Sequence, residues 1–248
     1  MAARKRAGVP VRIREVVAID DPSFDRAYRL LRGVFPRSEL MPRREWNYAM
    51  RERSLGLYTD QNWHVLVAER GTELIGVASG SYVGNVNVGV IGYIAVNPRV
   101  RSKGVGLRLR QRLRRAFERD AQRVRRRQLT AIIGEVHINN PWLRRLVRRG
   151  RAIALDFPYF QPSLRSRRRP VELVLYYEPL DRPRTSLPAT ELRRLLYMLW
   201  RRAYRIPRPV SRPAFRRMLR ALEGRRRIGR RKLPPLEASR ASRAMRES

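Results

Sequence analysis

Residues 90–107 read Val90-Ile-Gly-Tyr-Ile-Ala-Val-Asn-Pro-Arg-Val-Arg-Ser-Lys-Gly-Val-Gly-Leu107. Residues 90–96 are mostly apolar and β-branched, which is typical of a buried strand, and Asn97-Pro98 marks its end. A short basic loop with two glycines follows, and apolar residues at helical spacing begin directly after it. The segment therefore predicts a strand, a tight turn and a helix N-terminus in series.

The turn in this segment has the properties of an anion-binding site. The N-terminus of the following helix presents backbone N–H groups and the positive end of the helix dipole to a phosphate. Gly104 and Gly106 lack a Cβ, which lets a ligand approach the backbone closely. Arg101 and Lys103 add positive charge for a diphosphate. Because arginine is abundant in this chain, the strand before the glycines and the helix after them carry the prediction more than the pattern Arg-x-x-Gly-x-Gly itself.

The other elements are predicted from apolar periodicity and from turn and capping residues. In chain order they are a strand at 11–17, helices at 21–33 and 38–53, strands at 63–69, 74–83 and 90–96, a helix from 105 to about 124, a strand at 129–136, a helix at 140–150, and strands at 152–155 and 171–177. The segment 156–162 is expected to be a loop. This order argues against a Rossmann domain, in which strands and helices alternate and the glycine turn follows the first strand.

The strand, turn and helix of residues 90–107 resemble the acyl-CoA-binding motif of the GNAT superfamily of N-acetyltransferases, Gln/Arg-x-x-Gly-x-Gly/Ala. The order of elements extends the resemblance over roughly residues 11–179. It implies an α/β (α+β) fold, with a mixed, mostly antiparallel twisted sheet flanked by helices. It also implies acetyl-CoA as the cofactor and transfer of its acyl group to a primary amine by direct attack.

The resemblance places the cofactor along the same segment. The pyrophosphate is expected on the loop amides of residues 101–106, and the pantetheine arm beside the end of the strand at 94–96. An asparagine near the start of the helix at 140–150 also belongs to the family's pattern. The cofactor-binding residues expected on this basis are Ile94, Ala95, Val96, Arg101, Ser102, Lys103, Gly104, Val105, Gly106, Leu107, Asn139 and Asn140.

Acyl transfer to an amine needs an unprotonated nucleophile, because an amine of pKa ~10.4 is neutral only about once in 10³ molecules at pH 7. Glu135 ends the strand next to the motif helix and is the first candidate for the base. An ordinary ion pair with one of the many arginines is the alternative. His137 lies on the same face of an extended chain and is the second candidate; a structural or solvated histidine is its alternative.

One feature of the family pattern is missing. The family often carries a tyrosine about two turns into the helix that follows the asparagine, where it protonates the departing thiolate. Leu146 and Val147 occupy the matching positions. Tyr159, in the segment 156–162, is the candidate replacement, and an aromatic loop that closes the core edge is the alternative. Asp20, Asp21, Glu39 and Glu45 lie in the region that shapes the family's acceptor pocket, and they are candidates for binding a cationic acceptor or ordinary carboxylates near helix starts.

Composition limits the remaining classes of function. The chain has 248 residues, 43% of them hydrophobic, and four tryptophans, which is enough for a sizeable core. The absence of cysteine excludes disulfides, thiolate catalysis and cysteine-ligated metal, and no metal site is predicted. No stretch has the length and apolar character of a signal peptide or a membrane span, so a cytoplasmic location is the expectation. His64, far from the motif, is expected to be structural.

The net charge of +36 admits two interpretations. Only Lys5, Lys103 and Lys232 are lysines, so an arginine-rich composition explains the charge without any function. Such a surface also attracts nucleic acid non-specifically. The competing function is therefore a weakly catalytic or non-catalytic member of the same fold that binds nucleic acid or another polyanion.

The charge and the periodicity divide the chain into four parts. They are a disordered basic leader at 1–10, the acetyltransferase domain at 11–180, an arginine-rich helical extension at 181–224 and a disordered basic tail at 225–248. The extension has one amphipathic helix at about 189–205 and a second from Pro213. Because these helices are too short to be stable alone, they are expected to pack on the domain or on a second copy in a homodimer. A position on an anionic membrane surface is the alternative.

Overall fold

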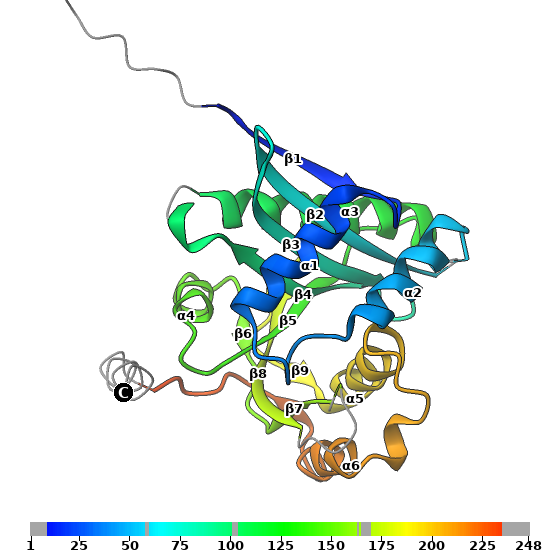
Figure 1. The fold of residues 1–248 in the computed structure, drawn as a ribbon. Coiled ribbons are helices and arrows are strands. Elements are labelled where there is room, and N and C mark those ends of the chain that lie inside the picture. The colour runs from blue at the N-terminus through cyan, green and yellow to red at the C-terminus, as the bar shows by residue number, and fades with distance from the viewer. Residues whose placement is uncertain (1–8, 58–59, 101–103, 163, 165–169, 235–248) are drawn as a thin grey trace, which may run out of the picture.

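The computed structural model describes residues 9–57, 60–100, 104–162, 164 and 170–234. An eight-stranded sheet in the order β1-β2-β3-β4-β5-β8-β6, with β7 paired to β8, forms its centre (Figure 1). The strands are β1 (Val11–Val16), β2 (Gln61–Arg70), β3 (Glu73–Val83), β4 (Val88–Val96), β5 (Ala131–Val136), β6 (Ile153–Ala154), β7 (Tyr159–Gln161) and β8 (Val171–Pro179). Among these strands only β4 and β5 run parallel. The predicted mixed, mostly antiparallel sheet is confirmed.

Helices cover both faces of the sheet. On one face α1 (Pro22–Val34) and α2 (Arg43–Ser54) pack on β2, β3 and β4. On the other face α3 (Val105–Arg125) packs on the same strands, and α4 (Pro141–Arg148) packs on β6 and β8 (Figure 1). The predicted starts of α1 and α4 are confirmed, because the side chains of Asp21 and Asn140 accept hydrogen bonds from first-turn N–H groups.

The parallel pair β4 and β5 separates partway along its length. Pairing runs from Val88 opposite Ala131 to Ile91 opposite Gly134 and then stops, although both strands continue. On its other side β4 pairs with β3 through a shift in register next to Ile91, which leaves Gly92 as the extra residue of a β-bulge. The edge of β4 from residue 92 to 96 therefore has no strand partner on the β5 side among the described residues.

The segment 156–162, predicted to be a loop, contains β7. Tyr159, Phe160 and Gln161 pair with Leu173, Glu172 and Val171 of β8. Both aromatic side chains are buried, so the segment extends the sheet and fills its core. The proline and glycine signals that ended the neighbouring elements did not reveal this short strand.

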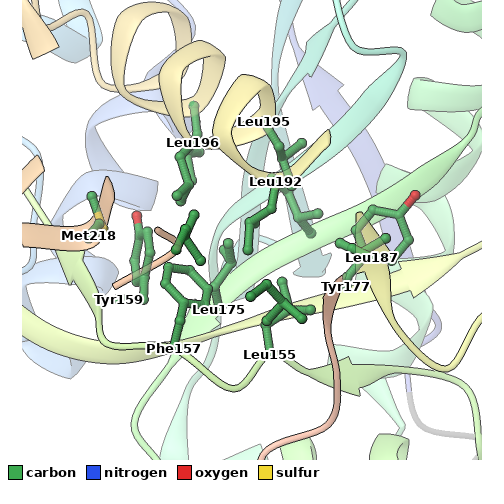
Figure 2. Packing of buried hydrophobic residues seen from close by; sticks show 14 of the residues in the cluster. Leu155, Phe157, Tyr159, Leu175, Tyr177, Leu187, Leu192, Leu195, Leu196 and Met218 are labelled. Carbon is green, nitrogen blue, oxygen red and sulfur yellow. The ribbon is translucent and has the colours of Figure 1, made fainter. Parts of the chain in front are cut away.

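The C-terminal segment packs on the sheet beside α1 and α2. It consists of β9 (Leu187–Pro188), α5 (Ala189–Met198), a π-helical turn (Leu199–Ala203), a 3₁₀ turn (Pro209–Ser211), α6 (Pro213–Arg220) and β10 (Arg227–Ile228). The helix predicted at 189–205 is thus α-helical only to Met198, whereas the start at Pro213 is confirmed. Figure 2 shows Leu192, Leu195 and Leu196 of α5 facing Tyr159, Leu175 and Tyr177 of the sheet. Because the apolar faces of both helices are buried in this core, they are not available to a membrane.

The prediction of a disordered tail from residue 225 onward is wrong for residues 225–234. β10 pairs with β9, and Arg230 forms an isolated bridge with Leu155. The side chain of Ile228 is fully buried, which fixes this stretch to the core. Most of the predicted leader, residues 1–8, and the end of the predicted tail, residues 235–248, lie outside the described residues.

Two further properties concern the described residues as a whole. None of their helices combines the length and the apolar character needed to cross a lipid bilayer. Nor does any group of three or more histidine, aspartate or glutamate side chains among them form a set that could hold a metal ion.

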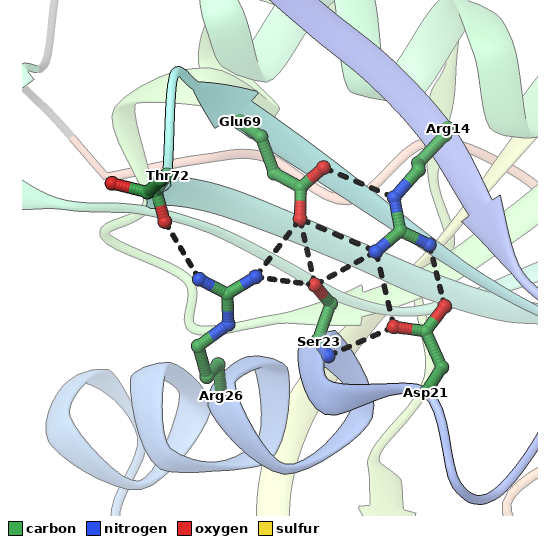
Figure 3. Close-up of polar contacts among 6 residues, drawn as sticks. All are labelled: Arg14, Asp21, Ser23, Arg26, Glu69 and Thr72. Atoms are coloured by element: carbon green, nitrogen blue, oxygen red, sulfur yellow. Dashed lines mark hydrogen bonds and ion pairs between the residues drawn. The ribbon is translucent and has the colours of Figure 1, made fainter.

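A polar network ties the first strand to the first helix (Figure 3). Arg14 of β1 donates to Asp21 at the start of α1 and to Glu69 of β2. Ser23 donates its hydroxyl to Glu69 over 2.6 Å, and Arg26 donates to both Ser23 and Glu69. These bonds fix the N-terminus of α1 on the β1–β2 edge, far along the chain from the glycine turn.

A second network is buried around His64. Its Nδ1 lies 2.5 Å from Glu15 Oε1 and its Nε2 lies 2.7 Å from Asp120 Oδ2. Burial lowers the pKa of His64, but the hydrogen bonds and charges of Asp120 and Glu15 outweigh it, so the pKa is raised. Burial raises the pKa of Glu15, but the hydrogen bonds and charges of His64 and Arg53 lower it by more, so the resulting pKa is about 2. The pKa of Asp120 is lowered in the same way, chiefly by His64. The triad joins β1, β2 and α3, which agrees with the structural role expected of His64.

His64→Gln is expected to lower the free energy of unfolding by ~1.5–3 kcal/mol at pH 6, because it removes the charge-assisted hydrogen bonds of the buried imidazolium. It leaves Glu15 with Arg53 and Asp120 with Arg123 as their remaining cations. The contribution of a histidine with a raised pKa is complete below about pH 6.5 and decreases as the pH rises through the folded-state pKa. The two carboxylates contribute above their unfolded pKa values, so the triad stabilises most between about pH 5 and 7. Urea unfolding at pH 6 and at pH 9 measures both the loss and its decrease.

His137→Gln is the matched control for this prediction, because the His137 side chain is 55% exposed and its ion pair lies at the surface. We expect it to change the free energy of unfolding by less than about 1 kcal/mol at either pH. A loss in His64→Gln no larger than in the control would contradict the role assigned to the triad.

Candidate active site

A small cavity opens where β4 and β5 separate, on the face covered by α1, α2 and the C-terminal segment. Its volume is about 80 Å³. Glu39 and Glu135 are the acidic residues among its described lining, and Ser79, Ser81 and Gln161 are uncharged polar ones. Apolar and aromatic side chains complete the walls, namely Phe35, Met41, Trp46, Trp63, Val90, Ile91, Tyr93, Leu173, Ala203 and Tyr204. The cavity thus combines an apolar surface with two carboxylates.

Glu135 lies at the end of β5 with both carboxylate oxygens hydrogen-bonded. Tyr159 donates its hydroxyl to Oε1 over 2.7 Å, and Tyr204 donates to Oε2 over 2.6 Å. Burial raises the pKa of Glu135, the two tyrosines lower it, and the net result is a pKa of about 7. Each carboxylate oxygen retains a second lone pair, so the group is able to accept a proton.

Glu39 and His137 lie together at the rim of the site. His137 Nε2 is 3.1 Å from Glu39 Oε1, and the histidine is exposed. The backbone carbonyl of Glu39 accepts hydrogen bonds from Gln161 over 3.1 Å and from the hydroxyl of Tyr93 over 2.8 Å. These two bonds attach the loop between α1 and α2 to β7 and β4, and so hold the carboxylate of Glu39 at the cavity.

The other acids predicted near the acceptor pocket have different surroundings. Asp21 caps α1 and pairs with Arg14 in the network of Figure 3. Glu45 pairs with Arg44 at the surface of α2. Asp20 is not among the described residues that line the cavity. Of the four candidates, the fold brings Glu39 alone to the cavity lining.

The glycine turn lies at the start of α3. Gly104 has a φ of +73°, which favours glycine, and a Cβ at this position would meet open space. No side chain of the described residues caps the 21-residue helix, and its first turn carries no acid. The N–H groups of Val105, Gly106 and Leu107 are therefore open to an anion. Arg101, Ser102 and Lys103 lie outside the described residues.

The predicted cofactor residues of β4 occupy both sheet faces. Ala95 is buried against α1 and α2, whereas Ile94 and Val96 are partly buried on the α3 face, on the same side as the turn. The Cγ2 atom of Val96 lies 3.6 Å from the position of a Cβ on Gly106. The unpaired edge of β4 therefore leads from the cavity to the glycine turn.

The asparagines before α4 are less informative. Asn140 uses its Oδ1 to cap the helix, at 2.9 Å from the N–H of Trp142. Asn139 is partly exposed. Leu146 and Val147, where the family tyrosine would stand, are buried against β6 and β8.

Comparison with known proteins agrees with this geometry. The sequence model of the acetyltransferase (GNAT) family matches residues 24–150, which is just over half of the chain. The chain belongs to the GNAT family. It is thus an acetyl-CoA-dependent N-acetyltransferase, as the glycine turn and the order of elements predicted. No curated protein matches the chain in sequence.

Solved structures of GNAT proteins are similar to this one. A GNAT-family protein from Bacteroides thetaiotaomicron has 17% identity and a TM-score of 0.54, with 79% of this chain and 99% of that one covered. The yncA protein of Salmonella typhimurium, solved with acetyl-CoA, has 18% identity and a TM-score of 0.48, with coverage of 70% and 95%. The ribosomal-protein-S18-alanine N-acetyltransferase of Escherichia coli has 14% identity and a TM-score of 0.48, with coverage of 70% and 96%.

The residues of this GNAT enzyme fit its cofactor. Open N–H groups and a glycine with free space above it suit a diphosphate at the start of α3. The edge of β4 without a strand partner provides backbone donors and acceptors for the amides of a pantetheine arm. At the β-bulge, this edge meets the cavity that Glu135 lines.

Sequence reasoning missed part of the site. Tyr204 and Gln161 belong to no motif, and Tyr93 lies in the segment 90–107 but was not predicted as a site residue. Each reaches the site through contacts between residues far apart in the chain. Tyr204 lies at the end of the amphipathic helix predicted at about 189–205 and precedes Pro207, a pattern that indicates only a helix end.

Proposed function

We propose that this enzyme acetylates a primary amine by direct attack, with Glu135 as the group that accepts the amine proton. The observation that carries the proposal is the position of Glu135 in the cavity at the β4–β5 separation, with a pKa of about 7. A general base is most effective when its pKa lies near the working pH. With a pKa of about 7, the group has its carboxylate form available near neutrality and is still basic enough to take a proton.

The chain's own residues would divide the work as follows. Glu135 and Glu39 attract the ammonium form of the acceptor into the cavity, where it loses one proton to solvent and becomes the neutral amine. The unprotonated carboxylate of Glu135 then accepts the second proton as the neutral nitrogen attacks. When bound, acetyl-CoA supplies an acetyl thioester whose thiolate leaves as the amide bond forms. Backbone N–H groups on the unpaired edge of β4 are placed to stabilise a developing oxyanion.

We assign Tyr159 to holding Glu135 rather than to protonating the thiolate. Its side chain is fully buried and its hydroxyl proton is donated to Glu135. Burial, with the nearby charge of Glu135, raises its pKa well above the usual value. His137 is the alternative base, but it is exposed and paired with Glu39 at the rim.

The walls of the cavity suggest which amines to test. Phe35, Met41 and Trp46 give the cavity lined by Glu135 an apolar surface, which suits an amine on a short apolar substituent. The acceptor itself is open among small amines, amino-acid derivatives, aminoglycoside-type antibiotics and protein N-termini. The alternative that the arginine-rich surface binds nucleic acid, and the predicted homodimer, stay predictions.

The test is an acceptor screen with nucleic-acid-free protein and acetyl-CoA. Release of free CoA thiol is followed in the presence of panels of the four amine classes, and mass spectrometry identifies the product. We expect N-acetylation of at least one primary amine well above the hydrolysis of acetyl-CoA alone. Acetylation of a hydroxyl acceptor instead, or hydrolysis only with every panel, would contradict the proposal.

A further inference from the structure

The C-terminal segment contributes a residue to the site. Trp200 is buried against Phe215 of α6, with ring centroids 5.1 Å apart, and it belongs to the same apolar cluster as Tyr159 and Leu175 of the sheet. The segment is therefore built into the domain core next to the cavity. Residues that follow Trp200 directly are held at a fixed position relative to β5 and β7.

A change of helix type directs Tyr204 toward Glu135. The α5 helix widens into a π turn at Leu199, where the N–H of Tyr204 donates to the carbonyl of Leu199 over 3.1 Å. The chain then reverses at Arg205, whose φ of +58° is unusual for a non-glycine residue. Such turns are rare and occur often at functional sites. Here the turn places Ala203 and Tyr204 in the cavity lining.

Two ion pairs tie the π turn and the residues that follow it to α2 and to the residue before β2. Arg205 pairs with Glu52 of α2, and Arg202 lies 3.6 Å from Asp60 just before β2. The π turn is thus connected both to the sheet beneath it and to the helical layer beside it. This double attachment limits the movement of the Tyr204 hydroxyl.

We propose that Tyr204 is a positioning residue of the active site, which holds the Glu135 carboxylate in place together with Tyr159. The C-terminal segment is then part of the catalytic apparatus and not only a covering of the sheet. The inference rests on the proposed role of Glu135, but the hydrogen bond that carries it is independent of that role. Tyr204 approaches the carboxylate from the C-terminal segment and Tyr159 approaches it from β7, so the two hydroxyls fix the plane of the group from two directions.

Other titratable groups face Glu135 from the elements around it. Tyr93 of β4 lines the same cavity and donates its hydroxyl to the backbone of Glu39. Glu39 also lines this cavity, and its carboxylate lies 3.1 Å from the imidazole of His137. A titration of Glu135 must therefore be compared among variants that leave these three groups unchanged.

Tyr204→Phe removes the hydroxyl and keeps the ring. The protein is labelled with ¹³C at the glutamate side-chain carboxyl, the Glu135 signal is assigned by its absence in Glu135→Gln, and its midpoint is followed by NMR from pH 4 to 9. The hydrogen bond from Tyr204 favours the charged form, so its loss is expected to raise the midpoint by about one pH unit. Tyr159→Phe is expected to raise it similarly.

Tyr82→Phe is the matched control, because it also removes a buried hydroxyl that donates a hydrogen bond, to Asn87 over 2.9 Å, away from Glu135. Its Glu135 midpoint is expected to match that of the unaltered protein. An unchanged midpoint in Tyr204→Phe, or an equal change in Tyr82→Phe, would overturn the inference. The acid limb of kcat/KM should move together with the midpoint. If the midpoint moves while activity shows no limb, the proposed base is wrong and the positioning contact stands.

Discussion

Glu135→Gln is expected to lower kcat/KM for the amine identified by the acceptor screen by about 10²-fold or more at pH 8, with the affinity for acetyl-CoA unchanged. The amide retains the shape of the carboxylate but does not accept the proton. Steady-state kinetics at several amine concentrations measures the loss, and calorimetric titration with acetyl-CoA checks that the cofactor site is intact.

The pH profile makes the same prediction more specific. Because the pKa of Glu135 is raised to about 7, the group is protonated and inactive as a base below that pH. Activity of the unaltered enzyme should therefore rise with pH through about 7, and this limb should be absent in Glu135→Gln. His137→Gln tests the alternative base. If it removes the limb while Glu135→Gln retains it, the histidine is the proton acceptor.

A loss of stability does not explain the expected loss of activity in Glu135→Gln. A glutamate with a raised pKa binds its proton more tightly in the folded state, so stability falls as the pH rises from the ordinary glutamate pKa of 4.5 to about 7, and the full cost applies above that pH. Glu135→Gln removes that cost, while its amide oxygen accepts from one tyrosine hydroxyl and its NH2 group donates to the oxygen of the other. We expect its free energy of unfolding at pH 8 to be no lower than that of the unaltered protein.

The parts of the site that could be predicted are those with local signals. Gly104 and Gly106 follow a strand and begin a helix, so about twenty residues of local sequence are enough to predict their role in the turn. Glu135 was a candidate because it ends the strand next to the motif helix, and it lies in the lining of the cavity. The family's missing tyrosine was also apparent, since Leu146 and Val147 have the apolar spacing of a buried helix face, and both are buried.

The parts that could not be predicted depend on tertiary contacts. A π turn is not specified by any pattern of apolar residues. The predicted helix of residues 189–205 therefore gave no indication that the chain would bring the Tyr204 hydroxyl to Glu135 of β5. The strand β7 has three residues and owes its existence to pairing with β8. The pKa of Glu135 likewise follows from burial by segments far away in the chain, which the sequence near residue 135 does not contain.

Gly104→Asp should weaken binding of acetyl-CoA by about 10- to 10³-fold, because a carboxylate close to the diphosphate opposes it by ~1–4 kcal/mol. Gly104→Asn is the matched variant. Both side chains meet open space, and both variants lose stability because the φ of +73° is unfavourable for a residue with a Cβ. Asp and Asn are also both good N-cap residues for α3. The two variants differ in charge alone, so their ratio of affinities isolates the electrostatic role of the turn.

Compared with Gly104→Asn, Gly104→Asp should bind acetyl-CoA more weakly but be at least as stable to unfolding. A negative charge at a helix N-terminus stabilises the helix by a few tenths of a kcal/mol to about 1 kcal/mol, so Gly104→Asp should unfold no more easily than Gly104→Asn. Its weaker binding is then not the result of misfolding. The difference in affinity should also shrink as salt is raised, because charges near the surface are screened. Calorimetric titrations at low and moderate salt measure both effects, and equal affinities of the two variants at low salt would show that the diphosphate binds elsewhere.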